Sequence, residues 1–132
     1  MELAPGKKIY FLSDFHLGAP NEVESRKRED RLVRFLNHAK QDAAQIFIVG
    51  DIFDFWFEYK TVVPKGFVRI LGCLAQISDA GIPIHIFTGN HDLWMQDYLT
   101  KEINAKVYFE PHPFKLGNKQ FYIGHGDGLG PG

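Results

Sequence analysis

Four short clusters of Asp, His and Asn residues follow apolar runs along the chain. They are Asp14-Phe15-His16, Gly50 to Asp54, Gly89 to Asp92, and Gly124 to Asp127. In open α/β sheets, ligands bind at the carboxyl ends of the strands, so we expect the four clusters to meet at one edge of a sheet. Taken alone, each cluster is better explained by turn residues, helix caps or satisfied polar groups. Their convergence is what predicts a functional site.

The donor types in these clusters suit divalent metal ions. Carboxylate, imidazole and amide donors without a thiolate favour manganese, iron or zinc and argue against structural zinc. A carboxylate such as Asp51 can bridge two cations about 3.5–4 Å apart, which clamps the attacking and leaving oxygens of a phosphoryl transfer. We therefore predict two divalent ions, with manganese as first choice and iron or zinc as alternatives. One ion is assigned to Asp14, His16 and Asp51, and the other to Asp51, Asn90 and His125.

The elements that must position these clusters are those of an α/β fold. Residues 9–12, 46–49 and 82–87 are short continuous apolar runs, which are typical of parallel strands covered on both faces. Between them, apolar residues recur at helical spacing over 32–39 and 67–78. The predicted order therefore begins strand, helix, strand, helix, strand.

After a short helix predicted over 94–101, the pattern changes to that of a hairpin. Short runs at 106–109, 114–116 and 120–123 accompany Gly117-Asn118, a pair that suits a two-residue turn with positive φ. The last strand is therefore expected to run antiparallel to the strand before it. We predict a mixed α/β sheet with flanking helices in a single domain that spans residues 1–132.

Composition limits the classes of function. With 15 basic and 16 acidic residues the net charge is −1, which does not fit a protein that holds nucleic acid through its phosphates. The lone cysteine, Cys73, cannot form an internal disulfide, and residues 1–6 lack a signal-peptide layout, so we expect a cytoplasmic protein. No run approaches the ~20 apolar residues of a membrane span, and peripheral membrane contact stays open.

The four clusters resemble the motifs of the calcineurin-like metallophosphoesterase superfamily. Its D-x-H, G-D-x-x-D, G-N-H-[DE] and G-H signatures occur here in order, between residues 8 and 127. The resemblance implies a four-layer αββα sandwich, of which this chain would form part. It also implies the metal ligands assigned above. It adds His91 as the histidine that assists the leaving group, with Asp92 orienting it, and Asp54 as a carboxylate that supports the ligands from behind.

Within the superfamily, residues 51–59 and 89–94 look most like the bacterial UDP-2,3-diacylglucosamine hydrolase family. This likeness implies hydrolysis of a phosphoanhydride in UDP-2,3-diacylglucosamine, a nucleotide-linked lipid, to a lipid monophosphate and UMP in lipid A biosynthesis. It also implies a peripheral position at the inner membrane. Many members of that family carry arginine where this chain has His91. The alternatives are a phosphoesterase acting on another phosphodiester or nucleotide, and a non-catalytic scaffold of the same fold.

One superfamily motif is missing. The G-H-x-H signature, which gives each metal one more histidine, does not occur before Gly132. We therefore expect the chain to be the N-terminal part of a longer protein. Alone, it is expected to bind metal weakly, to hydrolyse nothing efficiently, and to self-associate through an uncovered sheet face or edge.

Overall fold

The computed structural model describes residues 5–13, 16–18, 21–50, 66–88, 98–116 and 119–124. The strand and helix alternation predicted for the first part of the chain is confirmed. The elements, in chain order, are β1 (Lys8–Leu12), α1 (Glu22–Ala39), β2 (Ala43–Val49), α2 (Val68–Asp79), β3 (Ile84–Phe87), α3 (Tyr98–Ile103), β4 (Lys106–Tyr108), β5 (His112–Leu116) and β6 (Lys119–Ile123).

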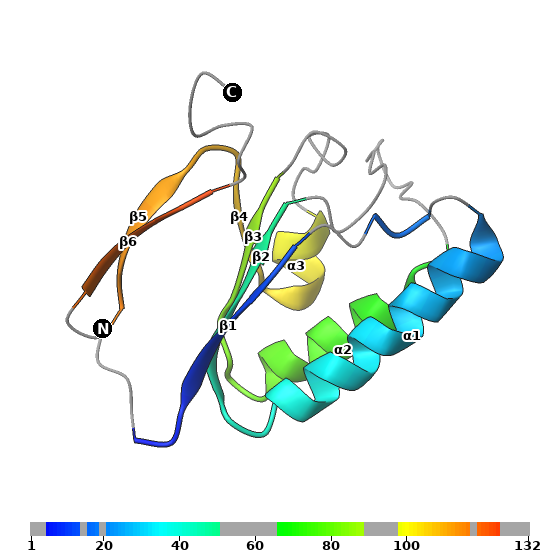
Figure 1. Ribbon diagram of the computed structural model, residues 1–132, viewed down its shortest axis with the longest axis horizontal. Coiled ribbons are helices and arrows are strands. Elements are labelled where there is room, and N and C mark those ends of the chain that lie inside the picture. Colours follow the sequence, from blue (N-terminus) through cyan, green and yellow to red (C-terminus); the bar gives the residue numbers. More distant parts are fainter. Residues whose placement is uncertain are drawn as a thin grey trace.

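The strands form two sheets. β1, β2, β3 and β4 make a parallel sheet in that order, and β5 pairs with β6 in a separate antiparallel sheet. The helices cover one face of the parallel sheet, and the β5–β6 hairpin lies on its other side (Figure 1). The α/β class and the antiparallel last strand are confirmed. However, the sequence pattern groups residues 106–109 with the hairpin. In the structure these residues include β4, which pairs in parallel with β3 and so belongs to the parallel sheet.

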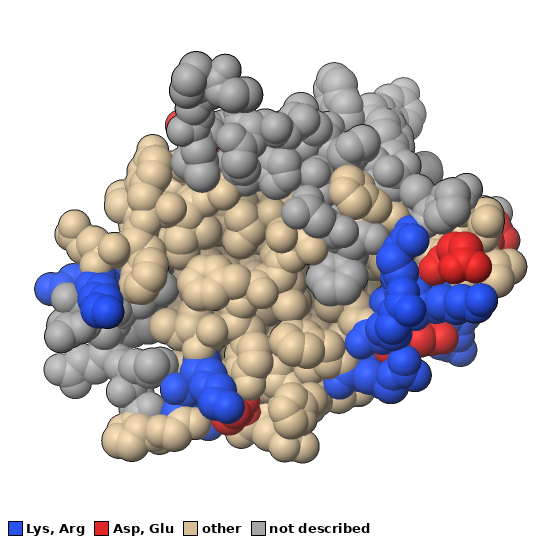
Figure 2. Space-filling view, viewed as in Figure 1, with Lys and Arg blue, Asp and Glu red and all other residues tan. Residues whose placement is uncertain are grey.

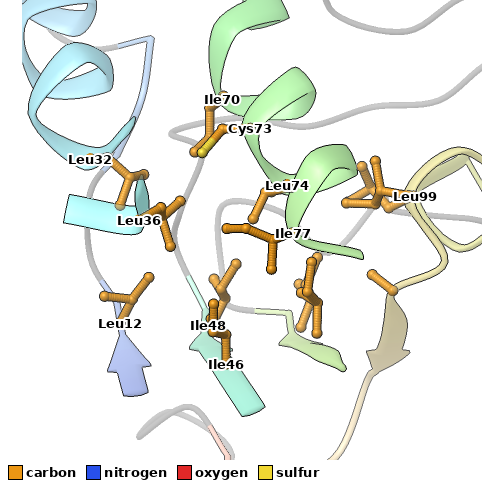
Figure 3. Close-up of a cluster of buried hydrophobic side chains, with 14 of the residues drawn as sticks. Leu12, Leu32, Leu36, Ile46, Ile48, Ile70, Cys73, Leu74, Ile77 and Leu99 are labelled. Carbon is orange, nitrogen blue, oxygen red and sulfur yellow. The ribbon is translucent and has the colours of Figure 1, made fainter. Parts of the chain in front are cut away.

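The main core lies between the parallel sheet and the helices. Ile46 and Ile48 of β2 point toward this side and are fully buried with Leu36 of α1 and Leu74 of α2 (Figure 3). Phe47, the residue between the two isoleucines, belongs to a second cluster on the hairpin side. Because both faces of β2 are covered, its apolar residues are continuous rather than alternating.

A buried carboxylate joins the two long helices. Glu29 of α1 is 2% exposed, and its Oε2 accepts the backbone N–H of Ile70 at 3.0 Å. Ile70 lies in the first turn of α2, where backbone N–H groups lack helical acceptors. Phe67, at the N-cap position of α2, has no side-chain acceptor for them. Glu29 therefore caps α2 from a neighbouring helix, a role that the sequence alone does not indicate.

The outer surface of α1 carries several basic side chains with acidic side chains among them. Figure 2 shows Lys and Arg side chains gathered over this helix, and the exposed members include Arg26, Lys27, Arg31 and Arg34. Arg26 also pairs with Asp30 one turn later, with 3.1 Å between Nε and Oδ1.

Among the described residues, no helix is long and apolar enough to cross a membrane.

Candidate metal centre

The carboxyl ends of the parallel strands lie at one edge of the sheet. Leu12 of β1 is paired with Ile48 of β2, and Val49 of β2 with Phe87 of β3, so the three strands end at nearly the same level (Figure 1). The residue that follows each strand therefore lies at the same edge. These residues are Ser13 and Thr88, each directly before a predicted cluster, and Gly50, the first residue of one.

The hairpin brings the start of the fourth cluster toward this edge from the other sheet. The backbone N–H of Thr88 donates to the carbonyl oxygen of Tyr108 at 3.0 Å, which places the end of β4 beside the end of β3. Pro111 follows shortly after and packs against Gly124. A Cβ atom added to Gly124 would lie 2.8 Å from the Cβ of Pro111. Gly124, which immediately precedes His125, is thus held close to the edge where the first three clusters begin.

Of the predicted site residues, the structure describes His16. It is half-buried and has a φ of +47°, in the left-handed region that costs a residue with a side chain about 1–2 kcal/mol. The convergence of the full site therefore stays a prediction, supported by the common edge. The predicted residues outside the described ranges are Asp14, Asp51, Asp54, Asn90, His91, Asp92 and His125.

Helix α1 holds the segment that contains His16. The backbone N–H of Gly18 donates to the Ser25 hydroxyl oxygen at 2.6 Å. The guanidinium of Arg28 donates from Nη2 to the carbonyl oxygen of His16 at 3.0 Å. Ser25 and Arg28 are three residues apart and so lie on one face of the helix. The sequence gives no signal for these contacts, because both residues fall within a charged run that suits solvent equally well.

The glycine at the end of β2 has a conformational role. Gly50 is buried and has a φ of +77°, which a residue with a Cβ atom adopts only at a cost. It turns the chain out of the sheet directly before Asp51, the predicted shared ligand. The glycine of the G-D-x-x-D motif is therefore explained by the backbone conformation at the strand end.

A buried polar group lies between the parallel sheet and the hairpin. His85 is 6% exposed, with Nε2 2.6 Å from Gln45 Oε1 and Nδ1 3.0 Å from the Tyr108 hydroxyl. With the Gln45 oxygen accepting, Nε2 carries the proton and Tyr108 donates to Nδ1. Burial, together with the positive charge of Lys106, lowers the pKa of His85 to about 4. The ring is therefore neutral at pH 7.

An aromatic side chain of the hairpin packs against His85 and its neighbouring rings. Phe114 of β5 meets the rings of Phe47, His85 and Tyr108 edge to face, with centroid distances of 5.0, 5.3 and 5.6 Å. Edge-to-face pairs of this kind add to the stability gained by burial alone. These contacts dock the hairpin on the sheet and thereby fix the strand that leads to Gly124.

Comparisons with known proteins identify the family of the chain. The family model "Calcineurin-like phosphoesterase" matches residues 7–129. The UDP-2,3-diacylglucosamine hydrolase of Porphyromonas gingivalis (strain ATCC BAA-308 / W83) is 48% identical over 120 residues, which are 91% of this chain and 46% of that protein. Enzymes of the same name from Pseudomonas fluorescens (strain SBW25) and Hahella chejuensis (strain KCTC 2396) are 30% and 29% identical over 92% and 90% of this chain, each over 47% of its own length.

The chain therefore spans about half the length of the curated relatives it matches. The family model covers nearly all of it, including every strand of the fold described above. The chain belongs to the calcineurin-like phosphoesterase family.

Proposed function

We propose that this chain carries a large part of the metal centre of a two-metal phosphoesterase. The observation that carries the proposal is the common edge of the sheet, where three parallel strands end immediately before Asp- and His-containing motifs. Membership of the family implies divalent metal ions. The oxygen and imidazole donors of the motifs fit that class of ion. We propose manganese as the metal, with iron or zinc as alternatives.

The proposed ligands divide into two sets that share one residue. Asp14 and His16 hold one ion, Asn90 and His125 hold the other, and Asp51 contacts both. When bound, the two cations activate water and neutralise charge at the phosphorus centre. The carboxylates offset the mutual repulsion of the cations, and Asp51 does so for both at once. It is therefore the residue whose loss should be least tolerated.

Three further residues have proposed roles outside the metal ligands. His91 donates a proton to the leaving oxygen, Asp92 orients His91, and Asp54 holds a ligand in place by hydrogen bonding.

The role of His91 predicts a separation of activity from metal content. His91→Ala in the full-length protein should lower turnover by roughly 10²–10⁴-fold, as expected on loss of a general acid, while metal analysis finds nearly the same content. A substrate with a very good leaving group needs no acid, so its hydrolysis should be nearly unaffected. Loss of metal together with activity would instead make His91 a ligand.

We propose UDP-2,3-diacylglucosamine as the substrate, cleaved at its phosphoanhydride to a lipid monophosphate and UMP in lipid A biosynthesis. The support is the 48% identity to an enzyme named for that substrate. The resemblance of residues 51–59 and 89–94 to that enzyme family points the same way. A phosphoesterase for another phosphodiester or nucleotide is the alternative within the same class. A non-catalytic scaffold is less well supported because the donor residues of all four motifs are present.

Turnover by the full-length protein with Mn²⁺ tests the proposal. We expect release of UMP from UDP-2,3-diacylglucosamine and its abolition in Asp51→Ala. Asp79→Ala, at an exposed position at the end of α2, is the matched control and should retain activity. Hydrolysis of other phosphodiesters alone would favour the alternative substrate class. Metal binding without turnover of any phosphoester would favour the scaffold.

The remaining proposals concern surroundings and partners. We place the protein in the cytoplasm, with peripheral contact to the inner membrane where a lipid-linked substrate would be reached, and without nucleic acid as a partner. The support is the net charge of −1, which does not fit a nucleic-acid partner, and the single cysteine of the 132 residues, which leaves no internal disulfide. We further propose that residues 1–132 fold as one domain and, as an isolated chain, self-associate.

A further inference from the structure

We infer that Arg28 of α1 is a positioning residue for the metal ligand His16. The inference rests on the proposed function, because it requires His16 to bind a metal ion. Its basis is the hydrogen bond from Arg28 Nη2 to the carbonyl oxygen of His16, 3.0 Å long and spanning twelve residues of sequence. Through this bond α1 reaches the backbone of the first metal-binding motif.

The backbone at His16 needs such support. Its φ of +47° is unfavourable for a residue with a Cβ atom, and such conformations persist only when the surroundings hold them. Arg28 fixes the carbonyl on one side of Leu17, which is fully buried. The bond from the Gly18 N–H to Ser25 fixes the chain on the other side. The direction in which His16 leaves the backbone is therefore set by two contacts from a single helix.

The surroundings of Arg28 indicate a specific role rather than a general contribution to stability. Its Nε atom is buried, and it has no hydrogen-bond partner in the part of the chain that the structure describes. A buried donor without a partner in a charged group opposes folding. Neighbouring Glu29 is instead bound to the start of α2. The bond to His16 is thus the contact that explains where the guanidinium lies.

The charge of Arg28 and its positioning role predict opposite effects on metal affinity when the side chain is replaced. A guanidinium beside a centre that binds cations repels them, so loss of its charge alone would strengthen metal binding. Loss of positioning would weaken it, because the residues that orient ligands typically contribute a factor of 10–100 to metal affinity. The direction of the change in Arg28→Met therefore separates the two explanations.

Calorimetric titration of the full-length protein with Mn²⁺ provides the test. For Arg28→Met we expect one of the two ions to bind roughly 10- to 100-fold more weakly and the other to be little changed. Arg26→Met is the matched control, because Arg26 lies on the same helix with its side chain 48% exposed and should not alter the affinity. Arg28→Lys keeps the charge and one donor and should fall between wild type and Arg28→Met.

A double mutant distinguishes positioning from a general loss of structure. In a His16→Ala background, Arg28→Met should cause no further loss of Mn²⁺ affinity, because the ligand through which it acts is gone. Equal or tighter binding in Arg28→Met, or the same loss in both backgrounds, would overturn the inference. If Arg28→Met does not fold, wild-type affinity in Arg28→Lys would overturn it. A wild-type protein that binds no Mn²⁺ would overturn the proposed function itself.

Discussion

Glycine precedes three of the proposed ligands, and the two of these glycines that the structure describes, Gly50 and Gly124, are required for different physical reasons. Gly50, before Asp51, has a positive φ that turns the chain out of β2. Gly124, before His125, leaves no room for a side chain because Pro111 lies against it. One glycine is required by backbone conformation and the other by close packing, although both appear in the sequence only as part of a motif.

Gly124→Ala should therefore destabilise the protein. The added Cβ would lie 2.8 Å from Pro111 Cβ and 2.9 Å from Pro111 Cα, and neither atom is the end of a flexible side chain. We expect a loss of about 1–3 kcal/mol in the free energy of unfolding, measured with urea. The control is Gly72→Ala in the middle of α2, where nothing lies within 4 Å of the added atom and helix propensity should stabilise by about 0.5–1 kcal/mol. Equal urea midpoints for Gly124→Ala and wild type would contradict the packing argument.

The ligands themselves could be predicted from sequence because their chemistry is a property of residue type. Asp, His and Asn at the ends of apolar runs are visible without coordinates. The residues that hold them are harder to find. Arg28 contacts His16 because α1 packs beside residues 16–18 in the fold, and nothing in the sequence around Arg28 distinguishes it from exposed Arg26 or Arg31.

At the scale of elements, the hairpin depends on a buried neutral histidine. His85 is bonded to Gln45 and to Tyr108, and Phe114 of the hairpin packs on its ring. Protonation would force Nδ1 to donate toward a hydroxyl that currently donates to it, and would place a charge beneath the hairpin. Docking of the hairpin should therefore weaken in acid.

The pH dependence of stability tests this. The pKa of His85 is about 4 in the folded protein, below its ordinary value of 6.5, so the unfolded chain binds more protons between these values. Stability from His85 is complete above pH 6.5 and falls as the pH drops toward 4, by at most ~1.4 kcal/mol per pH unit. Urea unfolding should show a smaller loss in His85→Gln over this range. His38→Gln, at an exposed position, should behave as wild type, and equal slopes for all three would contradict the account.

The order of elements could be predicted because each has a clear period. Strands β1, β2 and β3 are continuous apolar runs, and α1 and α2 show helical spacing. The division of the later strands between two sheets could not be predicted from the sequence. β4 and β5 are both short, and they differ only in the strand with which each pairs: β4 pairs with β3, and β5 pairs with β6. The burial of Glu29 is missed for a similar reason, since its acceptor role depends on the approach of α2.

At the scale of the whole molecule, large aromatic side chains remain exposed on β1 and β6. Phe11 of β1 is 50% exposed although it stacks on Phe47, and Phe121 and Tyr122 of β6 are 41% and 66% exposed. β1 is also an edge strand of the parallel sheet. Exposed apolar surface and an open strand edge both favour association.

The 132-residue chain should therefore form dimers or larger assemblies. Light scattering at increasing concentration should give a mass above the monomer mass of 15.1 kDa. Phe11→Lys should shift the assembly toward monomer, because a charge on an edge strand opposes pairing. Val68→Lys on α2, at a position that is 78% exposed, serves as the control and should leave the state of assembly unchanged. A monodisperse wild-type monomer would show that these aromatic side chains do not drive association.

The account depends most on the claim that the common edge of the sheet binds two cations that share Asp51. The most direct measurement is the number of Mn²⁺ ions bound per full-length chain at equilibrium, for wild type, Asp51→Ala and the exposed-position control Asp79→Ala. We predict two ions for wild type and for Asp79→Ala, and loss of both sites in Asp51→Ala, because a shared carboxylate offsets the repulsion between the two cations. Two ions retained by Asp51→Ala, or no more than one bound by wild type, would contradict the account.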